Sequence, residues 1–494
     1  MPRTFPRSDT SRLKILFVST ECSPWVKSGG LGDVSSALPR ALVGLGHDVR
    51  VLLPAYAALR PLIAQAGDSV HIGPQGPWPG ATLNRLDLEG FPLWVLDCPE
   101  LYDRAGSPYG DAAGHDHADN AFRFAFLSHV AAGLCAPAGP WSPWVADILH
   151  ANDWPTGLSP AYLSLLPHAP AASVFTIHNL AFQGNFDAAL APRLAIPAAW
   201  LNVEGILHWD RISMMKAGLR HAGVVTTVSP TYAREIQSPE FGCGLEGMLQ
   251  LRSNALVGLL NGIDTREWNP AIDTLIASRY SAGEWTAKAR NGEALRKRMG
   301  LATGRGILFG MVSRLTSQKG VDLVLESLER LLELGGQLVV LGSGEAALEQ
   351  RLRDAAQRWP GRVAVQIGFD EALAHLIEAG ADCFLMPSRF EPCGLNQMYS
   401  LVYGTPPIVH ATGGLADTVT DADASPDGTG FVMTAPTSTA LSDAIERAVR
   451  AFADRPRWRR LQQRGMGRQF GWSRGAAGYV AAYKSAIVTR QRAA

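Results

Sequence analysis

The segment Ser388-Arg389-Phe390-Glu391-Pro392-Cys393-Gly394-Leu395 separates an apolar run from a stretch with helical character. The run before it, residues 383–387 (CFLMP), is typical of a buried strand, and residues 396–401 (NQMYSL) are typical of the start of a helix. A carboxylate at the end of a parallel strand, next to a glycine at a helix entry, lies where open α/β sheets bind ligands. Glu391 is therefore a candidate site residue, and the alternative is that it only caps the helix that follows.

Length and composition limit the number of domains and the classes of protein to which the chain can belong. Its 494 residues exceed the usual size of one domain, and the 47% apolar fraction is sufficient for two large cores. The formal net charge of zero argues against a general nucleic-acid or polyanion binder. No apolar run reaches the length of a membrane span. We therefore expect neither a nucleic acid nor a membrane as a partner.

The N-terminal residues and the cysteines indicate the cellular setting. Residues 1–12 are polar and lack the apolar core of a secretion signal, so we expect a short disordered leader there. The six cysteines are scattered and form no Cys-x-x-Cys pair. This pattern favours neither a zinc site nor a disulfide framework. A reducing, cytoplasmic setting fits best.

The first half opens with a strand, a loop, a helix and a second strand. Residues 13–20 (LKILFVST) and 47–54 (HDVRVLLP) are typical of buried parallel strands. Between them, apolar residues from 34 to 42 recur with helical spacing. Pro39 inside that pattern predicts either a kink or a late start of the helix. The order of these elements indicates a βαβ unit.

A glycine loop connects the first strand to this helix. It carries Lys27 beside Gly29 and Gly30, followed by Asp33, but it lacks the third glycine of a dinucleotide fingerprint. A lysine next to free backbone N–H groups at a helix entry suits an anionic phosphate. A plain tight turn with a solvated lysine is the alternative, and the loop by itself does not decide between the two.

Two more polar residues stand where strands are expected to end. Asp153 follows the strand of residues 148–152, and His178 ends the strand that begins at residue 173. Because neighbouring parallel strands end at one edge of a sheet, we expect the two side chains to converge on one cleft. A purely structural role is the alternative for His178. Residues 60–120, by contrast, favour irregular loops and short strands.

The second half repeats the strand–loop–helix order. The loop after the strand of residues 306–312 carries Arg314 and Lys319, which suit a diphosphate or are simply solvated. The pair Gly413-Gly414 stands at a later helix entry. The segment Gly342-x-Gly344-x-x-Ala347 is a lone match to a dinucleotide fingerprint, which is weak evidence for a nicotinamide dehydrogenase.

Two such α/β halves predict two doubly wound, Rossmann-like domains that face a deep cleft. We place the boundary after residue 262, which gives domains of residues 1–262 and 263–494. We expect the last helix to pack back on the first domain. The sequence indicates nothing about the oligomeric state.

The assembled motifs resemble those of the glycogen and starch synthase family over residues 13 to 485. The segments that carry the resemblance are 27–34 (KSGGLGDV), 150–154 (HANDW), 176–180 (TIHNL), 261–264 (NGID), 313–320 (SRLTSQKG) and 387–395 (PSRFEPCGL). The resemblance implies the GT-B glycosyltransferase fold, with the acceptor on the first domain and the sugar nucleotide on the second. It also implies transfer of glucose to the non-reducing end of an α-1,4-glucan such as glycogen, with retention of anomeric configuration and without a metal or cofactor.

The resemblance further implies roles for individual residues. Arg314 and Lys319 match residues that bind the donor diphosphate, Glu391 matches an acid that contacts the donor sugar, and Phe369 matches an aromatic ring against the base. The implied catalytic residues are Glu391, His178, Asp153, Lys27, Arg314 and Lys319. The implied donor-binding residues are Lys27, Gly29, Gly30, Asp33, Asn261, Arg314, Lys319, Phe369, Ser388, Cys393, Gly394, Leu395, Gly413 and Gly414.

Three points stay open at this level. The bacterial and plant branch of the family implies ADP-glucose as donor, but no residue identifies the base, so UDP-glucose is the alternative. Retention is compatible with a covalent intermediate on Glu391 or Asp153, whereas the resemblance favours front-face attack in which the leaving phosphate takes the acceptor proton. The competing functions are a GT-B transferase with a small acceptor and an inactive glucan-binding protein.

Overall fold

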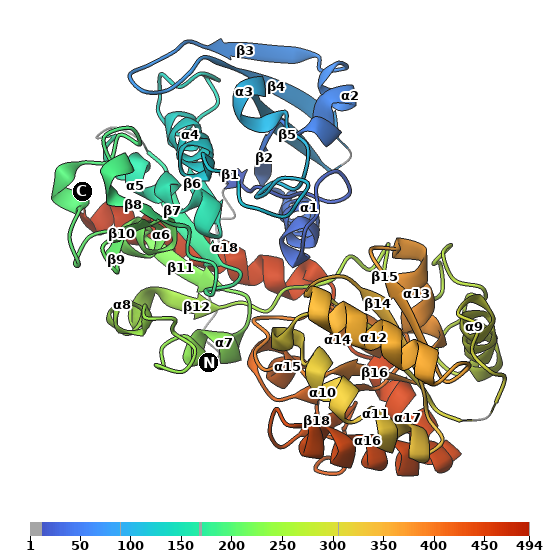
Figure 1. Ribbon diagram of the computed structural model, residues 1–494. Helices are drawn as coiled ribbons and strands as arrows, with labels where there is room; N and C mark the ends of the chain where they lie inside the picture. Colours follow the sequence, from blue (N-terminus) through green and yellow to red (C-terminus); the bar gives the residue numbers. More distant parts are fainter. Residues whose placement is uncertain (1–11, 89, 167–169, 305, 494) are drawn as a thin grey trace, which may run out of the picture. The chain divides into compact units, whose positions relative to one another are not determined.

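The computed structural model describes residues 12–88, 90–166, 170–304 and 306–493 (Figure 1). Contacts divide the chain into two compact units. Unit 1 contains the described residues up to Val228, then Ala233–Leu259 and the chain from Trp472 onward, and unit 2 contains Ser229–Tyr232 and Leu260–Gly471. The boundary after residue 262 and the cleft between the domains stay predictions.

Unit 1 contains a nine-stranded sheet in the order β12-β11-β7-β6-β1-β2-β5-β4-β3. Neighbouring strands from β12 to β5 are parallel, and β4 is antiparallel to both β5 and β3. The strands are β1 Lys14–Val18, β2 Asp48–Pro54, β3 Asp68–Ile72, β4 Ala81–Leu88, β5 Phe91–Asp97, β6 Ile148–Asn152, β7 Ala172–Ile177, β11 Val224–Thr227 and β12 Leu256–Gly258. A separate antiparallel sheet, in the order β8-β10-β9, contains β8 Asn185–Asp187, β9 Leu207–His208 and β10 Arg211–Ser213.

The helices of unit 1 cover this large sheet. They are α1 Gly30–Gly44, α2 Arg60–Ile63, α3 Pro99–Tyr102, α4 Asn120–Gly133, α5 Leu158–Ser164, α6 Met214–His221, α8 Glu246–Leu251 and α18 Trp472–Ala493, and α7 Pro230–Glu235 has residues in both units. The chain moves from β1 to β2 in one direction along the sheet and from β5 through β6 to β7 in the other. Right-handed crossovers therefore place α1 on one face and α4 and α5 on the opposite face.

The structure decides between the two alternatives for Pro39 only in part. The helix with Pro39 begins at Gly30, so the late start is wrong, and the kink stays a prediction. Proline offers no N–H to the carbonyl of Ser35, and that oxygen instead accepts a hydrogen bond from the thiol of Cys22 at 3.5 Å. The short strands expected within residues 60–120 are present as β3, β4 and β5, and β4 and β5 extend the main sheet.

The last helix belongs to unit 1. Helix α18 packs against α1 and β7, and Trp472, Tyr479 and Tyr483 are part of the buried core of this unit. The hydroxyl of Tyr483 lies 2.8 Å from Nδ1 of His150 on β6. Long-range packing of this kind, rather than chain continuity, places α18 in unit 1.

Unit 2 contains a six-stranded parallel sheet in the order β15-β14-β13-β16-β17-β18. This is the strand order of a Rossmann fold, in which the direction of winding reverses between β13 and β16. The strands are β13 Leu308–Val312, β14 Gln337–Gly342, β15 Val363–Ile367, β16 Cys383–Met386, β17 Pro407–His410 and β18 Phe431–Met433. The helices are α9 Trp285–Arg298, α10 Val321–Glu326, α11 Leu328–Glu333, α12 Ala346–Arg358, α13 Glu371–Gly380, α14 Asn396–Val402, α15 Gly413–Thr418, α16 Ser438–Ala453 and α17 Arg455–Met466.

Both faces of the unit 2 sheet are buried. Phe309 and Met311 on β13 join a core cluster with α10, α11, α12 and α16, whereas Leu308 joins a second cluster with α9, α13 and α14. Alternate residues of a strand point to opposite faces, so each strand contributes to both clusters. This double burial explains why the strands read as continuous apolar runs in the sequence. None of the helices in the described residues is long and apolar enough to span a membrane.

Candidate active site

In unit 2, the candidate residues Lys319 and Glu391 form an ion pair. Lys319 follows β13, Glu391 follows β16, and the two strands are neighbours. The ammonium group of Lys319 lies 2.5 Å from Oε2 of Glu391, and the hydroxyl of Ser388 donates to the same oxygen at 3.2 Å. The side chain of Glu391 is only 6% exposed. The pair lies at the carboxyl edge of the sheet, where the winding direction reverses and where open α/β sheets bind ligands.

Glu391 does not cap the helix that follows it. Helix α14 begins at Asn396, and its N-cap residue is Leu395, whose side chain makes no capping bond. Both bonds of the Glu391 carboxylate go to Lys319 and Ser388 instead. The capping interpretation that the sequence left open is therefore wrong.

A second ion pair, which no sequence motif predicted, holds the two loops together. The guanidinium group of Arg389 binds both oxygens of Asp322, at 2.8 and 2.6 Å. The backbone N–H of Arg389 also donates to the carbonyl of Gln318 at 2.9 Å. The partners lie far apart in the chain, so only the pairing of β13 with β16 brings them together. A bidentate arginine–carboxylate pair is geometrically strict, and it fixes the backbone next to Lys319 and Glu391.

The predicted glycine pair Gly413-Gly414 packs against the backbone of this same segment. A Cβ atom on Gly413 would lie 1.9 Å from the carbonyl oxygen of Glu391, and one on Gly414 would lie 2.0 Å from that of Cys393. The N–H of Gly414 donates to the Glu391 carbonyl at 3.1 Å. No side chain fits at either position, so the start of α15 reaches the Glu391 loop because both residues are glycine.

Asn261 and Cys393 are buried beside each other in unit 2. Burial raises the pKa of the Cys393 thiol to about 12, and hydrogen bonding from Asn261 opposes this rise. The thiol is therefore protonated at neutral pH and is no nucleophile. Gly394 has a φ of 68°, a left-handed conformation that glycine adopts without strain.

Arg314 and Phe369 lie in the solvent-exposed part of unit 2. Arg314 follows β13 and is exposed. Phe369 follows β15 and is 78% exposed. An aromatic ring that is not used in a core is available to a ligand, but the structure does not bring Phe369 into the Lys319–Glu391 cluster.

In the segment Gly342-x-Gly344-x-x-Ala347, the space beside the two glycines is filled by other backbone atoms of the protein. Cβ atoms on Gly342 and Gly344 would lie 1.9 Å from the carbonyl oxygen of Ser313 and 2.4 Å from that of Leu315. The N–H of Leu315 also donates to the carbonyl of Ser343 at 2.9 Å. These glycines admit the loop that carries Arg314 rather than a pyrophosphate, so they give no support to a nicotinamide dehydrogenase.

In unit 1, the loop after β1 is shaped by a buried carboxylate, that of Glu21, which no sequence motif indicates. Oε2 of Glu21 accepts hydrogen bonds from the backbone N–H groups of Ser28, at 2.6 Å, and Gly29, at 3.1 Å. Oε1 accepts from the hydroxyl of Tyr109 at 2.6 Å. Burial raises the pKa of Glu21, and these three bonds oppose the rise. Beyond the loop, Nζ of Lys27 lies 2.8 Å from Oδ1 of Asp33.

Asp153 and His178 lie at the ends of β6 and β7, which are parallel neighbours. The backbone N–H groups of Trp154, His178 and Asn179 bind the Asp153 carboxylate. Even so, burial raises the pKa of Asp153 to about 8, and its Oδ1 has no hydrogen-bond partner among the described residues. Asp153 also has a φ of 61°, unusual for a residue with a side chain. A strained residue with a displaced pKa is typical of a functional site.

His178 is neutral at physiological pH, because burial lowers its pKa to about 3. Its Nε2 lies 3.0 Å from Oδ1 of Asn152, and the amide group of Asn152 donates to the carbonyl of Val18. Since the amide nitrogen of Asn152 is used in this way, its oxygen accepts and Nε2 of His178 carries the proton. Nδ1 is left as an acceptor.

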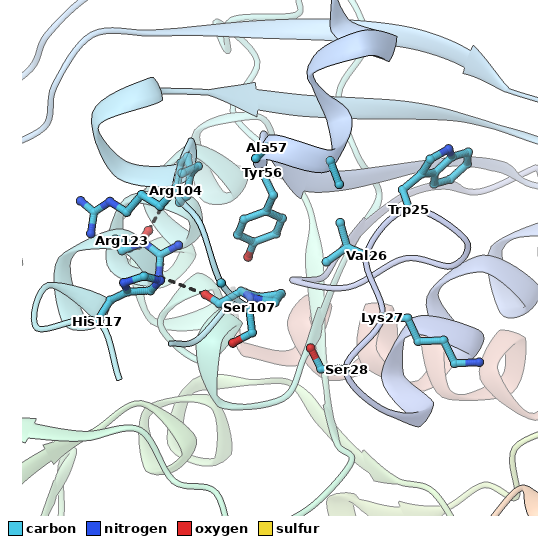
Figure 2. Close-up of a pocket in the computed structure, with 14 residues that line it drawn as sticks. Trp25, Val26, Lys27, Ser28, Tyr56, Ala57, Arg104, Ser107, His117 and Arg123 are labelled. Atoms are coloured by element: carbon cyan, nitrogen blue, oxygen red, sulfur yellow. Dashed lines mark hydrogen bonds between the residues drawn. The ribbon is translucent and has the colours of Figure 1, made fainter. Parts of the chain in front are cut away.

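A cavity of about 380 Å³ in unit 1 adjoins the Lys27 loop. Figure 2 shows Trp25, Lys27 and Ser28 on one side and the guanidinium groups of Arg104 and Arg123 on the other. Aromatic rings combined with a few polar groups are typical of small-molecule sites. Of these residues, only Lys27 was predicted from the sequence.

Comparisons with known proteins give one family for the whole chain. Residues 14–251 match the family described as "Starch synthase catalytic domain" and residues 294–464 match "Glycosyl transferases group 1". The glycogen synthase of Paracidovorax citrulli is 54% identical over 96% of this chain and 95% of the relative, and that of Dechloromonas aromatica is 53% identical over 97% and 100%. The catalytic domain of starch synthase IV from Arabidopsis thaliana, solved with ADP and acarbose, is 32% identical with a TM-score of 0.87, covering 97% of this chain and all of that one.

Proposed function

Because the chain belongs to the glycogen and starch synthase family of glycosyltransferases, we propose that it transfers glucose from ADP-glucose to the non-reducing end of an α-1,4-glucan, with retention of anomeric configuration. The observation that carries this proposal is an identity of 54% with a glycogen synthase over nearly the full length of both chains. The ADP and acarbose bound to the similar starch synthase support an adenine nucleotide and an oligosaccharide as ligands. The two units have the doubly wound sheets of the GT-B fold.

In unit 2, we assign Arg314 and Lys319 to the diphosphate of the donor. Breaking the bond between C1 of glucose and the diphosphate leaves negative charge on the phosphate, and fixed cations stabilise that charge as it develops. Glu391 holds the ammonium group of Lys319 in place at 2.5 Å. Ammonium has three N–H donors, so Lys319 can bind Glu391 and a phosphate oxygen together. The transfer itself then needs no metal ion.

The remaining donor-binding residues of unit 2 have supporting roles in this proposal. Ser388 orients Glu391, Phe369 stacks on the base, and Asn261 lies beside the turn that contacts the sugar. That turn is formed by Cys393, Gly394 and Leu395, with Gly413 and Gly414 packed against it.

In unit 1, we assign Lys27, Gly29, Gly30 and Asp33 to the phosphate side of the site. Asp153 and His178 are assigned to the transferred glucose and the acceptor. A neutral His178 can supply a hydrogen bond but no charge. A carboxyl group with a pKa of about 8 is mostly protonated at pH 7, so Asp153 is a poor nucleophile.

This protonation state favours front-face attack over a covalent intermediate on Asp153. The bond between C1 and the phosphate oxygen breaks, and the bond between C1 and the acceptor O4 forms on the same face. The proton of the acceptor hydroxyl passes to the leaving phosphate, which departs as ADP. Trapping a glucosyl ester on Asp153 or Glu391 in a slow variant would contradict this route.

The same proposal implies binding partners and a cellular location for the protein. Glycogen or a related glucan is the acceptor, and we propose a cytoplasmic enzyme that binds neither nucleic acid nor a membrane.

The experiment that tests this function supplies glycogen with either ADP-glucose or UDP-glucose to the purified protein. We expect glucose incorporation and nucleotide release mainly with ADP-glucose, and an α-linked product by proton NMR of the anomeric signal. Incorporation mainly from UDP-glucose would correct the donor. Nucleotide release without incorporation would indicate a small acceptor, and no turnover of either donor would favour a glucan-binding protein.

A further inference from the structure

A cluster of aromatic and charged side chains in unit 2 lies outside every residue assigned above. The ring of Trp268 is stacked between His375 and Tyr399, with centroid distances of 3.9 and 3.7 Å and interplanar angles of 16° and 10°. His375 is on α13 and is 1% exposed. The stacking holds the imidazole in one orientation.

The inner nitrogen of this imidazole has a buried carboxylate as its partner. Nδ1 of His375 lies 2.8 Å from Oδ2 of Asp273, which is itself 5% exposed. The hydroxyl of Tyr403 donates to the same oxygen at 2.5 Å, and the N–H of Leu275 donates to Oδ1 at 2.7 Å. An ionised carboxylate only accepts, so Nδ1 carries a proton and donates it to Asp273.

The outer nitrogen of His375 lies near Glu371, and Glu267 completes a cluster of three possible ligands. Nε2 is buried and makes no hydrogen bond with any described residue. Oε1 of Glu371, one helical turn earlier, lies 3.7 Å away. A carboxylate oxygen of Glu267, one of Glu371 and a ring nitrogen of His375 all lie within 4.8 Å of one another.

These distances approach those of a metal centre. Bonds of about 2.0–2.2 Å from a zinc ion to nitrogen and oxygen put neighbouring ligand atoms roughly 3.4 Å apart in a tetrahedron. Side-chain shifts on the order of 1 Å would therefore close the site. Of the three residues, Glu267 is exposed, Glu371 is half-buried and His375 is buried.

We propose that His375, Glu371 and Glu267 bind a divalent transition-metal ion of the Zn²⁺ type, with water completing its coordination. Imidazole favours zinc, cobalt or nickel over magnesium and calcium, which prefer oxygen ligands only. The Asp273–His375 hydrogen bond is the support that metal-binding histidines usually have on their second nitrogen. The ion ties the segment around Glu267 to α13 and has no part in glucose transfer.

The alternative is an imidazolium that bridges Asp273 and Glu371 without any ion. Both arrangements use the same contacts of His375, but only the metal site requires the exposed carboxylate of Glu267. Glu267→Gln therefore separates them, and as an exposed, isosteric change it leaves the core intact. Glu240→Gln, at an exposed position of unit 1, is the matched control with the same loss of charge.

The test uses the full chain after treatment with a chelator and measures binding of Co²⁺ by its visible absorption and of Zn²⁺ by calorimetry. We expect one tightly bound ion in the wild type and in Glu240→Gln, and binding weakened at least about tenfold in Glu267→Gln and Glu371→Gln. We also expect Zn²⁺, but not Mg²⁺, to raise the unfolding temperature of the wild type. Equal binding by wild type and Glu267→Gln, or no stoichiometric binding at all, would overturn the proposal.

Discussion

The ammonium group of Lys319 lies 2.5 Å from the carboxylate of Glu391, although the two residues are 72 positions apart in the chain. The parallel pairing of β13 with β16 brings their loops together. The Arg389–Asp322 pair, at 2.6 Å, fixes the same two loops a few residues away. The cation proposed for the leaving phosphate is therefore positioned before any donor binds, which is the condition for strong electrostatic stabilisation.

Removal of this cation is expected to lower the rate of transfer and, because it leaves the buried Glu391 carboxylate without its cation, also the stability of the fold. Lys319→Met should reduce kcat/KM for glucose transfer by about 10²–10³, because one preorganised contact to the developing charge is lost. Lys297→Met, at an exposed position on α9, is the matched control. Steady-state kinetics and thermal unfolding of both variants check this, and a loss of less than tenfold in Lys319→Met would remove Lys319 from the phosphate site.

The buried carboxylate of Glu21 is expected to control the Lys27 loop. Glu21→Ala leaves the N–H groups of Ser28 and Gly29 without their acceptor, so the loop loosens and kcat/KM should fall on the order of 10²-fold. Hydrogen exchange of these two amides should become faster. Glu100→Ala, at an exposed position on α3, serves as control. Unchanged exchange in Glu21→Ala would show that the loop is held by other contacts.

The raised pKa of Asp153 makes stability depend on pH. Burial raises this pKa to about 8, whereas an aspartate in an unfolded chain has a pKa of about 3.9. Between these values the folded protein retains a proton that the unfolded chain has released, so this residue lowers the free energy of unfolding as pH rises. The stabilising contribution of the bound proton to the free energy of unfolding is lost progressively from about pH 4 upward, and it changes little above about pH 8.

Asp153→Asn removes this titration. Relative to the wild type, its free energy of unfolding should increase by about 1–4 kcal/mol between pH 5 and pH 8. Urea denaturation at the two pH values measures the difference, and Asp116→Asn, at an exposed position of unit 1, is the matched control. If the difference in free energy of unfolding between Asp153→Asn and the wild type stays constant with pH, Asp153 ionises in its usual range.

The exposed ring of Phe369 is expected to bind the donor without stabilising the fold. Stacking of an aromatic ring on a base contributes about 1–3 kcal/mol, so Phe369→Ala should raise the KM for the sugar nucleotide about 5- to 100-fold. Because the ring is 78% exposed, the unfolding temperature should change little. Trp209→Ala, at another exposed aromatic residue (80% exposed), should leave that KM unchanged. An unchanged KM in Phe369→Ala would exclude stacking.

Local features of the sequence predicted much of the architecture, but not its details. The strands that flank Lys27, Asp153, Lys319 and Glu391 were found because each is a short apolar run next to glycine or polar residues. One error has a local cause. The late helix start predicted from Pro39 is wrong, and the carbonyl of Ser35 that proline leaves free accepts a hydrogen bond from the Cys22 thiol.

The residues of the candidate site also fall into two groups, those that the sequence predicted and those that only the structure revealed. Motifs placed Lys319, Glu391, Asp153 and His178 at strand ends, and the family resemblance was carried by these segments. Their partners could not be predicted, because Glu21, Tyr109 and Asp322 stand in no motif and act through contacts between distant segments. Arg389 lies inside the segment 387–395, but nothing in that segment identifies Asp322 as its partner.

The sequence by itself determined two α/β halves and the residues at the ends of their strands, because apolar periodicity and turn chemistry depend on near neighbours. Only the tertiary structure decided that β13 pairs with β16 and β6 with β7, which loop faces which, and that desolvation raises the pKa of Asp153 to about 8. Strand order and burial depend on packing between residues far apart in the chain, and both the partner of a charge and its pKa follow from that packing.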